Sequence, residues 1–197
     1  MSFWKSAYSS SPPPWDIGRP QPAFVELVSS GEIRPGRVLD VGCGTGNNAI
    51  FLVKSGYAVV GVDIVPEAIQ IARNRATEQN AKVDFLVSIA LELHSHFKEE
   101  EFDDVIDSGF FHTLSDEERQ TFSSQINRVL RRGANYFMLC FSDKERGDWG
   151  PRRVSKNEIK QTFSPIFRIN YIKETRFGTR WSDKGAKAYI TSATKVS

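Results

Sequence analysis

The sequence is poor in cysteine, has no long hydrophobic run and carries almost no excess charge. Two cysteines in 197 residues, Cys43 and Cys140, exclude a disulfide-rich scaffold and favour free thiols. The longest apolar run, around residues 136–141, has about six residues, whereas a membrane-spanning helix needs ~20. The net charge is only +2, and the basic residues are scattered apart from Arg131–Arg132 and Arg152–Arg153. We therefore expect neither a membrane partner nor a nucleic-acid partner.

The remaining composition is ordinary for a globular domain, with 40% hydrophobic and 25% charged residues. The first residues, MSFWKSAYSSSPPPW, contain no apolar segment of the secretion-signal type, so we expect a cytoplasmic protein. Their serine, proline and aromatic residues predict an arm over residues 1–22, followed by one domain over residues 23–197. The oligomeric state stays open between monomer and homodimer.

Strand-like and helix-like segments alternate along the domain, which predicts an α/β protein with a mostly parallel sheet covered on both faces. Two capping boxes, Ser115 with Glu118 and Ser155 with Glu158, mark helix starts, and we expect Gly133 to end the first of these helices. Alternating apolar residues near 167–171 and 186–190 predict an antiparallel hairpin at the sheet edge. The strands expected before the hairpin are 38–41, 57–62, 83–87, 102–107 and 135–141.

The stretch VLDVGCGTGNNA, residues 38–49, places three glycines within five positions directly after a strand. The dinucleotide fingerprint GxGxxG would have its third glycine at position 47, but here Asn47 stands there and the third glycine is Gly46. Asp40 precedes the first glycine, where an acid would repel a pyrophosphate at the helix N-terminus. The turn therefore predicts a phosphate-free nucleoside with a positive group. A plain tight turn is the simpler alternative.

A second acid, Asp63, ends the next predicted strand, where a carboxylate accepts hydrogen bonds from ribose hydroxyls. A solvated carboxylate at a strand end is the alternative for Asp63 alone. Combined with Asp40 and the glycine turn, Asp63 points to adenosine with a cationic, amino-acid-like tail. We therefore predict S-adenosyl-L-methionine as the cofactor and S-adenosyl-L-homocysteine as its product.

The same segments resemble the class I S-adenosylmethionine-dependent methyltransferases. VLDVGCGTGNNA is similar to the first motif of that family, VVGVDIVPEAIQIAR to its second strand and acid, and FDDVIDSGFFH to its fourth strand. PWDIGRPQPAFVEL and CFSDKERGDWGPRRVSKNEI are similar to the thiopurine- and thiol-methyltransferase-like subgroup, including bacterial enzymes that methylate heterocyclic toxins. The resemblance implies a Rossmann-like, doubly wound, seven-stranded sheet with an antiparallel C-terminal hairpin, and an arm that closes over the active site.

The resemblance also implies a set of cofactor residues. The acid and glycines of the first motif would hold the methionine end, and Asp63 with Ile64 would hold the ribose and one face of the adenine. Trp15 would form an aromatic wall, or alternatively only anchor the arm. Arg19 would donate to the cofactor carboxylate or to the substrate. The full expected set is Trp15, Arg19, Asp40, Gly42, Cys43, Gly44, Gly46, Asn47, Asp63, Ile64, Ile89, Ala90, Leu91, Asp107, Ser108 and Gly109.

The chain departs from the family pattern after the third strand. An acid usually binds the adenine amino group there, often within Gly-Asp-Ala, but the matching residues are Ser88, Ile89 and Ala90. Adenine recognition would then rest on apolar packing and on backbone groups of Ala90 and Leu91. One lost hydrogen bond is worth about 0.5–1.5 kcal/mol, so we expect cofactor binding to be weakened and not abolished.

His112 is the candidate catalytic residue, because it follows the fourth strand and histidine titrates near working pH. It would act as a general base on a hydroxyl or thiol. Two alternatives stay open: His112 only packs or binds the cofactor, or the substrate arrives ionised and needs no base. His94 and His96 have no cysteine or third histidine near them, so we expect no metal.

An aromatic group suits a flat heterocyclic substrate. The expected substrate residues are Phe111, Phe141, Trp149 and Arg152, with Phe110 as a further aromatic candidate. The arginine pair Arg152–Arg153 would steer an anionic substrate or simply be solvated. Three hypotheses follow: methylation of O, N or S on a small aromatic, including toxic, molecule; methylation of a simple thiol, halide or metalloid oxyanion; and cofactor binding without catalysis.

Overall fold

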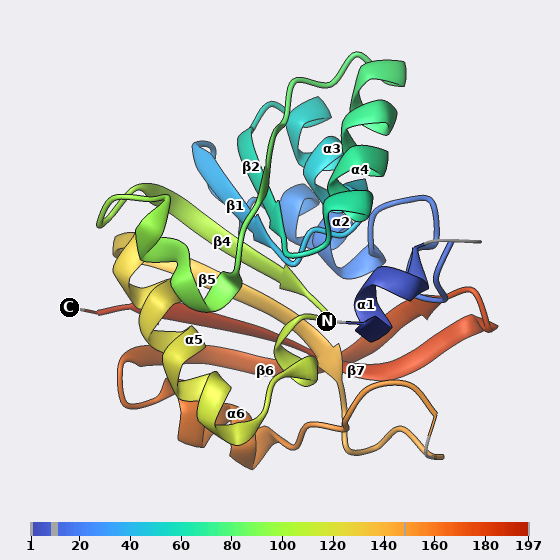
Figure 1. The fold of residues 1–197 in the computed structure, drawn as a ribbon. Coiled ribbons are helices and arrows are strands. Elements are labelled where there is room, and N and C mark those ends of the chain that lie inside the picture. Colours follow the sequence, from blue (N-terminus) through green and yellow to red (C-terminus); the bar gives the residue numbers. More distant parts are fainter. Residues whose placement is uncertain (1, 9–11, 148, 197) are drawn as a thin grey trace.

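In the computed structural model, which describes residues 2–8, 12–147 and 149–196, seven strands form one sheet in the order β3-β2-β1-β4-β5-β7-β6 (Figure 1). Strands β1 to β5 run parallel, and β7 is antiparallel to both β5 and β6. The expected α/β sheet with an antiparallel C-terminal hairpin is thus confirmed. The strands are β1 Arg37–Val41, β2 Ala58–Asp63, β3 Asp84–Val87, β4 Phe102–Ser108, β5 Leu130–Phe141, β6 Phe167–Thr179 and β7 Ser182–Lys195.

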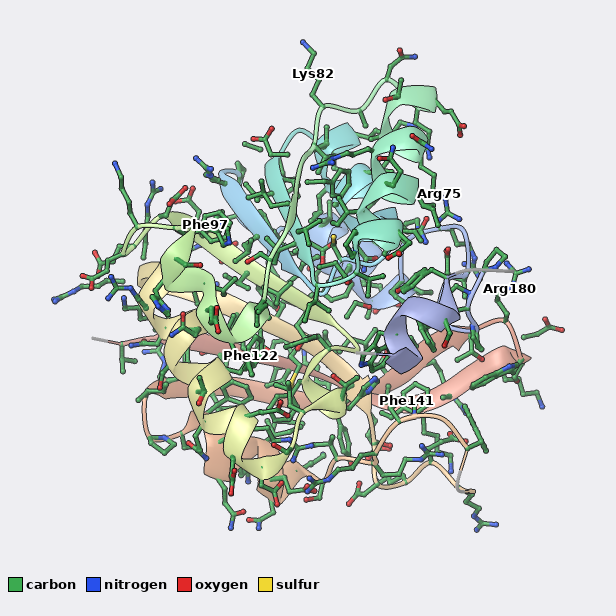
Figure 2. All side chains as sticks on the ribbon, in the orientation of Figure 1. Arg75, Lys82, Phe97, Phe122, Phe141 and Arg180 are labelled. Carbon is green, nitrogen blue, oxygen red and sulfur yellow. The ribbon has the colours of Figure 1, made fainter. Side chains whose placement is uncertain are left out.

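Helices cover both faces of the sheet (Figure 1). One face carries α2, α3 and α4, and the other carries α5 and α6, so two separate hydrophobic cores form. Phe122 points from α5 toward the sheet, whereas Lys82 projects away from the molecule (Figure 2). The helices are α1 Ser2–Ala7, α2 Pro22–Ser29, α3 Asn47–Lys54, α4 Pro66–Glu78, α5 Asp116–Val129 and α6 Lys156–Phe163, with short 3-10 helices η1 Ala90–Ser95 and η2 Phe111–Thr113.

Local sequence signals set most helix starts. Ser115 caps α5 and Ser155 caps α6, each by a reciprocal capping box with the glutamate three residues later. Pro66 occupies the first turn of α4, where its missing N–H leaves no hydrogen bond unmade. These positions confirm the predicted starts of three helices.

The junction between α5 and β5 differs from the prediction. The helix ends at Val129 and β5 begins at Leu130, so Gly133 lies inside the strand with a φ of +72°. The pairing with β4 is irregular there: Leu130 pairs with Phe102, but the next pair is Asn135 with Asp104. Gly133 therefore accommodates a bulge in β5 and does not terminate the helix.

Strand β1 lies at the topological switch point, between β2 and β4. Its Asp40 pairs in register with Gly61 of β2 and Ile106 of β4. The carboxyl ends of these three strands consequently meet at one edge of the sheet, which is where open parallel sheets bind ligands.

Candidate functional site

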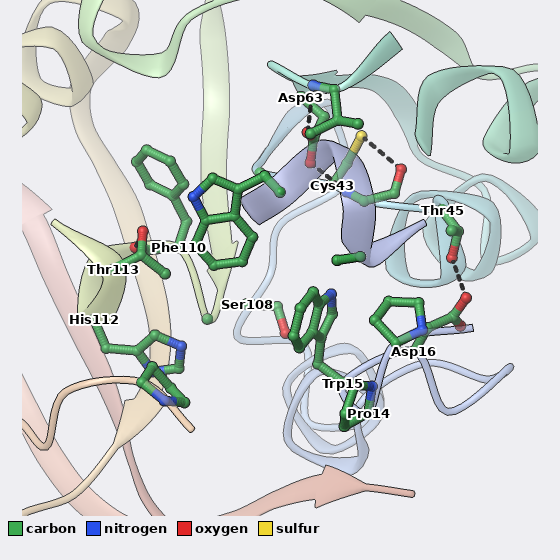
Figure 3. Close-up of a pocket in the computed structure, with 18 of the residues that line it drawn as sticks. Pro14, Trp15, Asp16, Cys43, Thr45, Asp63, Ser108, Phe110, His112 and Thr113 are labelled. Carbon is green, nitrogen blue, oxygen red and sulfur yellow. Dashed lines mark hydrogen bonds between the residues drawn. The ribbon is translucent and has the colours of Figure 1, made fainter. Parts of the chain in front are cut away.

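A cavity of about 1380 Å³ opens at this edge of the sheet. Pockets for one small ligand measure roughly 300–1,000 Å³, so the volume accommodates a cofactor together with a second molecule. The walls come from the segment before α2, the glycine turn after β1, the end of β2, the segment after β4 and the β6–β7 hairpin. Figure 3 shows Trp15, Cys43, Asp63, Ser108 and His112 around this space.

The three glycines after β1 all adopt positive φ angles, +66° at Gly42, +52° at Gly44 and +80° at Gly46, which side chains disfavour. A Cβ atom on Gly42 would lie 2.9 Å from Cβ of Phe110, and one on Gly46 would lie 2.6 Å from Cζ of Phe85. Gly42 and Gly44 line the cavity, whereas Gly46 does not. Glycine is therefore favoured in this turn for three reasons: the backbone conformation disfavours side chains, neighbouring side chains leave no room for a Cβ atom, and part of the turn faces the cavity.

Asp63 joins the end of β2 to the glycine turn. Its Oδ2 accepts a 2.9 Å hydrogen bond from the Gly44 N–H, and its Oδ1 accepts one of 2.9 Å from the Val65 N–H. Burial raises the pKa of Asp63 and the backbone amides partly offset this rise. The side chain lines the cavity and retains lone pairs for ribose hydroxyls.

Asp40 lies behind the turn and is only 1% exposed. Among the residues described, neither carboxyl oxygen has a hydrogen-bond partner of normal geometry. Burial, and then the charges of Asp107 and Asp63, raise the pKa of Asp40 well above its usual range. A buried carboxylate without partners is costly, so a positive charge near the turn would stabilise its ionised form.

Asp107 is the penultimate residue of β4 and does not line the cavity. Its oxygens accept hydrogen bonds from the N–H groups of Phe110 and Phe111 and from the Tyr136 hydroxyl at 2.9 Å. Burial raises the pKa of Asp107 to about 7 despite these donors. Asp107 therefore shapes the segment that carries His112, without lining the cavity.

The segment before α2 is fixed to the domain through Asp16. Its carboxylate accepts hydrogen bonds from Thr45 and Asn47 beside the glycine turn and forms a 3.0 Å ion pair with Arg75 of α4. The neighbouring Trp15 donates to the Tyr8 hydroxyl at 3.1 Å and lines the cavity. Trp15 thus contacts Tyr8 of the same segment and lines the cavity; whether it contacts the cofactor stays a prediction.

His112 is buried, at 5% exposure, and lines the cavity. The backbone N–H of Phe141 donates to its Nδ1 at 3.1 Å. A backbone N–H can only donate a hydrogen bond, so Nδ1 carries the lone pair and the neutral ring carries its hydrogen on Nε2. Burial, with the charges of Arg153 and Arg119, lowers the pKa of His112 to about 3. This tautomer does not suit the general-base role expected for His112, because neither ring nitrogen is free to accept a proton.

Aromatic rings surround the same end of the cavity. Phe141 packs edge-on against His112 at 5.1 Å, Phe177 at 5.2 Å and Trp149 at 5.6 Å between ring centroids. Trp149 in turn packs on Trp181 at 5.0 Å. We call these five residues the aromatic end of the cavity. A flat apolar molecule fits such a surface.

Fourteen of the expected site residues line the cavity. They are Trp15, Arg19, Gly42, Cys43, Gly44, Asn47, Asp63, Ile64, Ala90, Ser108, Gly109, His112, Phe141 and Arg152. The guanidinium of Arg152 already pairs with Asp116 and Glu158, so its charge is largely compensated.

The other seven lie elsewhere. Phe111 is fully buried in the core against Phe163, at 5.2 Å between ring centroids, which corrects its expected place in the substrate pocket. Trp149 does not line the cavity itself, but it packs on Phe141 and Trp181, which do. The remaining five, Asp40, Gly46, Ile89, Leu91 and Asp107, do not line the cavity either.

Several lining residues were missed from the sequence. Phe177 and Trp181 come from the β6–β7 hairpin, and Tyr8 comes from the segment after α1. Ser88 lies one residue before Ile89, which stands where the family acid would be; the Ser88 hydroxyl is buried and has no hydrogen-bond partner among the described residues. Its position directly before the missing acid is the one sequence signal that points to it.

Comparisons with known proteins agree with this geometry. Residues 38–133 match the family model described as a methyltransferase domain. The chain is 34% identical over 184 residues to the 2-heptyl-1-hydroxyquinolin-4(1H)-one methyltransferase of Mycobacteroides abscessus, covering 90% of this chain and 79% of that protein. It is 28% identical to the probable thiol methyltransferase 2 of Arabidopsis thaliana, covering 83% of this chain and 72% of that protein.

Solved structures extend the likeness to the whole fold. A protein from work on the conversion of a disulfide bond into a thioacetal group during echinomycin biosynthesis is 31% identical, with a TM-score of 0.88 over 99% of this chain and 92% of that one. The 1,6-didemethyltoxoflavin-N1-methyltransferase of Burkholderia thailandensis shares the fold, with 20% identity and a TM-score of 0.76 over 100% of this chain and 87% of that one.

The residues present fit S-adenosylmethionine, the family's methyl donor. Gly42 and Gly44 present bare backbone to the cavity, Asp63 stands at the end of β2, and the unpartnered Ser88 hydroxyl lines the same wall. Within the described residues, no helix is long and apolar enough to cross a membrane. Motif, sheet order, cavity and relatives agree, and the chain belongs to the class I S-adenosylmethionine-dependent methyltransferases.

Proposed function

We propose that the protein methylates an oxygen, nitrogen or sulfur atom of a small aromatic or heterocyclic molecule. The observation that carries this proposal is the aromatic end of the cavity, where Phe141 and Phe177 flank His112. His112, at this end, lies across the cavity from Asp63 (Figure 3). The volume of the cavity leaves room for such a ring beside the cofactor.

Different residues of the cavity would hold the cofactor and align the acceptor. Gly42, Gly44 and Asp63 would hold the cofactor, which when bound supplies an electrophilic methyl group on a sulfonium. Phe141 and Phe177 would hold the acceptor ring so that its reacting atom faces that methyl group. Alignment of this kind can contribute about 7–11 kcal/mol to lowering a barrier.

The names of the relatives support a small acceptor with a reactive heteroatom. The Mycobacteroides abscessus enzyme is named for a hydroxyquinolinone and the Burkholderia enzyme for a toxoflavin precursor. The Arabidopsis relative is named for thiols, so methylation of a simple thiol is the second candidate function. The aromatic end favours the first, because a small polar acceptor needs no such surface.

The test is a methylation assay analysed by mass spectrometry. The protein is incubated with S-adenosylmethionine and hydroxyquinolines, thiophenols and thiopurines on one side, and sulfide and iodide on the other. We expect methyl products from several ring compounds, and loss of those products in Asp63→Ala. Asp84→Ala, which removes an exposed carboxylate from β3, is the matched control. Turnover of sulfide or iodide alone would overturn the proposal.

A further inference from the structure

The surroundings of His112 restrict which acceptors the site can methylate. The hydrogen bond from the Phe141 N–H occupies Nδ1, and the opposite nitrogen, Nε2, lies beside Gly109. A Cβ atom on Gly109 would lie only 3.2 Å from Nε2, so the glycine leaves this nitrogen uncovered. No acceptor among the described residues takes a hydrogen bond from Nε2. The Nε2–H group is therefore free to donate into the cavity that His112 and Gly109 line.

The positive charges of Arg153 and Arg119 act on the His112 ring. The Arg153 guanidinium lies 5.4 Å from the centroid of Phe141 and 5.1 Å from that of Trp149, held by the carbonyls of Glu145, Gly147 and Pro151. From α5, the buried Arg119 lies 4.5 Å from the centroid of Phe111.

The cavity also carries negative charge: Glu118 of α5 lines it, and its Oε2 accepts a 2.8 Å hydrogen bond from the Ser115 N–H. Arg119 pairs with Glu158 at 3.0 Å, which compensates part of its charge. The carboxyl group of Asp107 in β4 accepts hydrogen bonds from Phe110, Phe111 and Tyr136. Two rings pack on His112, those of Phe141 and Phe177, and neither carries a charge. The charged groups that act on His112 are the two arginines and none of these carboxylates, so the potential near the ring favours an anion over a cation.

Building on the proposed function, we propose that His112 is a hydrogen-bond donor, through Nε2–H, to an acceptor that reaches the site already ionised. The substrates are therefore acidic hydroxyl or thiol compounds, such as N-hydroxy heterocycles and aryl thiols, that exist largely as anions at the working pH. Neutral alcohols and amines are excluded as efficient substrates.

The chemistry then needs no base on the protein. A lone pair of the acceptor anion forms the new bond to the methyl carbon, while the electron pair of the breaking S–C bond goes to sulfur. The negative charge of the acceptor and the positive charge of the sulfonium cancel, and no proton is released. Nε2–H orients the anion, and the hydrogen bond weakens as that charge disappears.

The first experiment measures kcat/KM against pH for substituted thiophenols of similar shape but different acidity. We expect each profile to rise with the ionisation of its own thiol and then to level off. A rise at one common pH for all thiols would show an enzyme base and overturn the proposal. If no thiophenol is methylated while other acceptors are, the proposed function still stands and N-hydroxyquinolinones of different acidity replace the thiols.

The second experiment needs no turnover. 4-Nitrothiophenol, whose anion is coloured, is titrated by absorbance with the protein loaded with S-adenosylhomocysteine. We expect the bound thiol to ionise at lower pH than the free thiol in the wild type, and this shift to be largely lost in His112→Leu. An unshifted thiol in the wild type would contradict the proposal.

The His112→Gln variant distinguishes a hydrogen-bond donor from a general base at this position. A glutamine amide can accept from the Phe141 N–H and still donate, so we expect kcat/KM to fall less than tenfold. Loss of a general base typically removes about 10²–10⁴-fold in rate, and a fall of that size in His112→Gln would overturn the proposal. His94→Gln, which alters an exposed histidine of η1, is the matched control.

Discussion

The main-chain N–H of Phe141 donates a 3.1 Å hydrogen bond to Nδ1 of His112, across the sheet edge from β5 to the segment after β4. Strand β5 thereby fixes the tautomer of a cavity residue through a main-chain N–H, which every substitution of Phe141 except proline retains. Together with burial, this bond keeps His112 neutral in the folded protein.

Neutral His112 predicts a specific pH dependence of stability. Its pKa is about 3 in the folded state and ordinarily 6.5, so the unfolded chain binds the proton first as pH falls. The contribution of His112 is present above pH 6.5 and is lost toward pH 3. We expect the free energy of unfolding of the wild type, relative to His112→Gln, to fall by about 1.4 kcal/mol per pH unit between pH 6 and 4. Urea unfolding at both pH values measures this; a pH-independent difference would contradict it.

We expect Asp40→Asn to affect the stability of the fold and the affinity for the cofactor differently. Because burial raises the pKa of Asp40, its contribution is full at low pH and is lost as pH rises through the folded-state pKa. At pH 8 we therefore expect the neutral, isosteric asparagine variant to be at least as stable as the wild type. Binding of S-adenosylmethionine should weaken by roughly 10- to 150-fold, since a charge-assisted interaction is worth about 1.5–3 kcal/mol.

Calorimetry and urea unfolding check the two halves of the Asp40 prediction. S-adenosylhomocysteine, which lacks the sulfonium charge, is the control ligand and should lose less affinity. Equal losses for both ligands would argue against an electrostatic role of Asp40.

Ser88→Ala should weaken cofactor binding without loss of stability. The hydroxyl is buried, lines the cavity and has no partner among the described residues, and the Ser88 N–H is fixed at 2.9 Å to the carbonyl of Asp63. One hydrogen bond to the adenine is worth about 0.5–1.5 kcal/mol. We expect the Kd of S-adenosylhomocysteine to rise about twofold to tenfold by calorimetry. Ser95→Ala, at an exposed serine of η1, should leave it unchanged.

Substitutions at two glycines with positive φ angles distinguish the cost of backbone strain from the cost of crowding an added Cβ atom. Gly56 has a φ of +95° with nothing within 4 Å of an added Cβ, whereas at Gly46 the added Cβ would lie 2.6 Å from Phe85. Gly56→Ala should cost about 1–2 kcal/mol of stability from backbone strain alone. Gly46→Ala should cost about 1–3 kcal/mol more from overpacking. Urea unfolding of both variants measures the difference, and equal costs would show that Phe85 moves freely.

Local patterns predicted most of the sheet, because each parallel strand and each capped helix carries its own signal. The exception at Leu130 has a physical reason. Val129, Leu130 and Gly133 read as the end of a helix, but pairing of Leu130 with Phe102 starts the strand earlier and leaves Gly133 in a bulge. Tertiary pairing decided that boundary.

The site was less predictable than the fold. The places of the glycine turn and Asp63 could be predicted from local spacing. The places of Phe110 and Phe111 could not, because these residues are adjacent and only the short helix η2 decides that Phe110 faces the cavity and Phe111 the core. The tautomer of His112 depends on a backbone amide of β5, which has no sequence signature. Phe177 joins the site through the register of β6 on β7.

Strand β7 lies inside the sheet although it follows every other strand along the chain. As a nascent polypeptide leaves the ribosome, β5 and β6 are made first but share no ladder until residues 182–195 are available to join them. Until then β5 exposes an unpaired edge, the kind of surface on which chaperones act and intermolecular pairing begins. Phe177 belongs to β6, so the hydrophobic wall beside His112 is completed only in this final step of assembly.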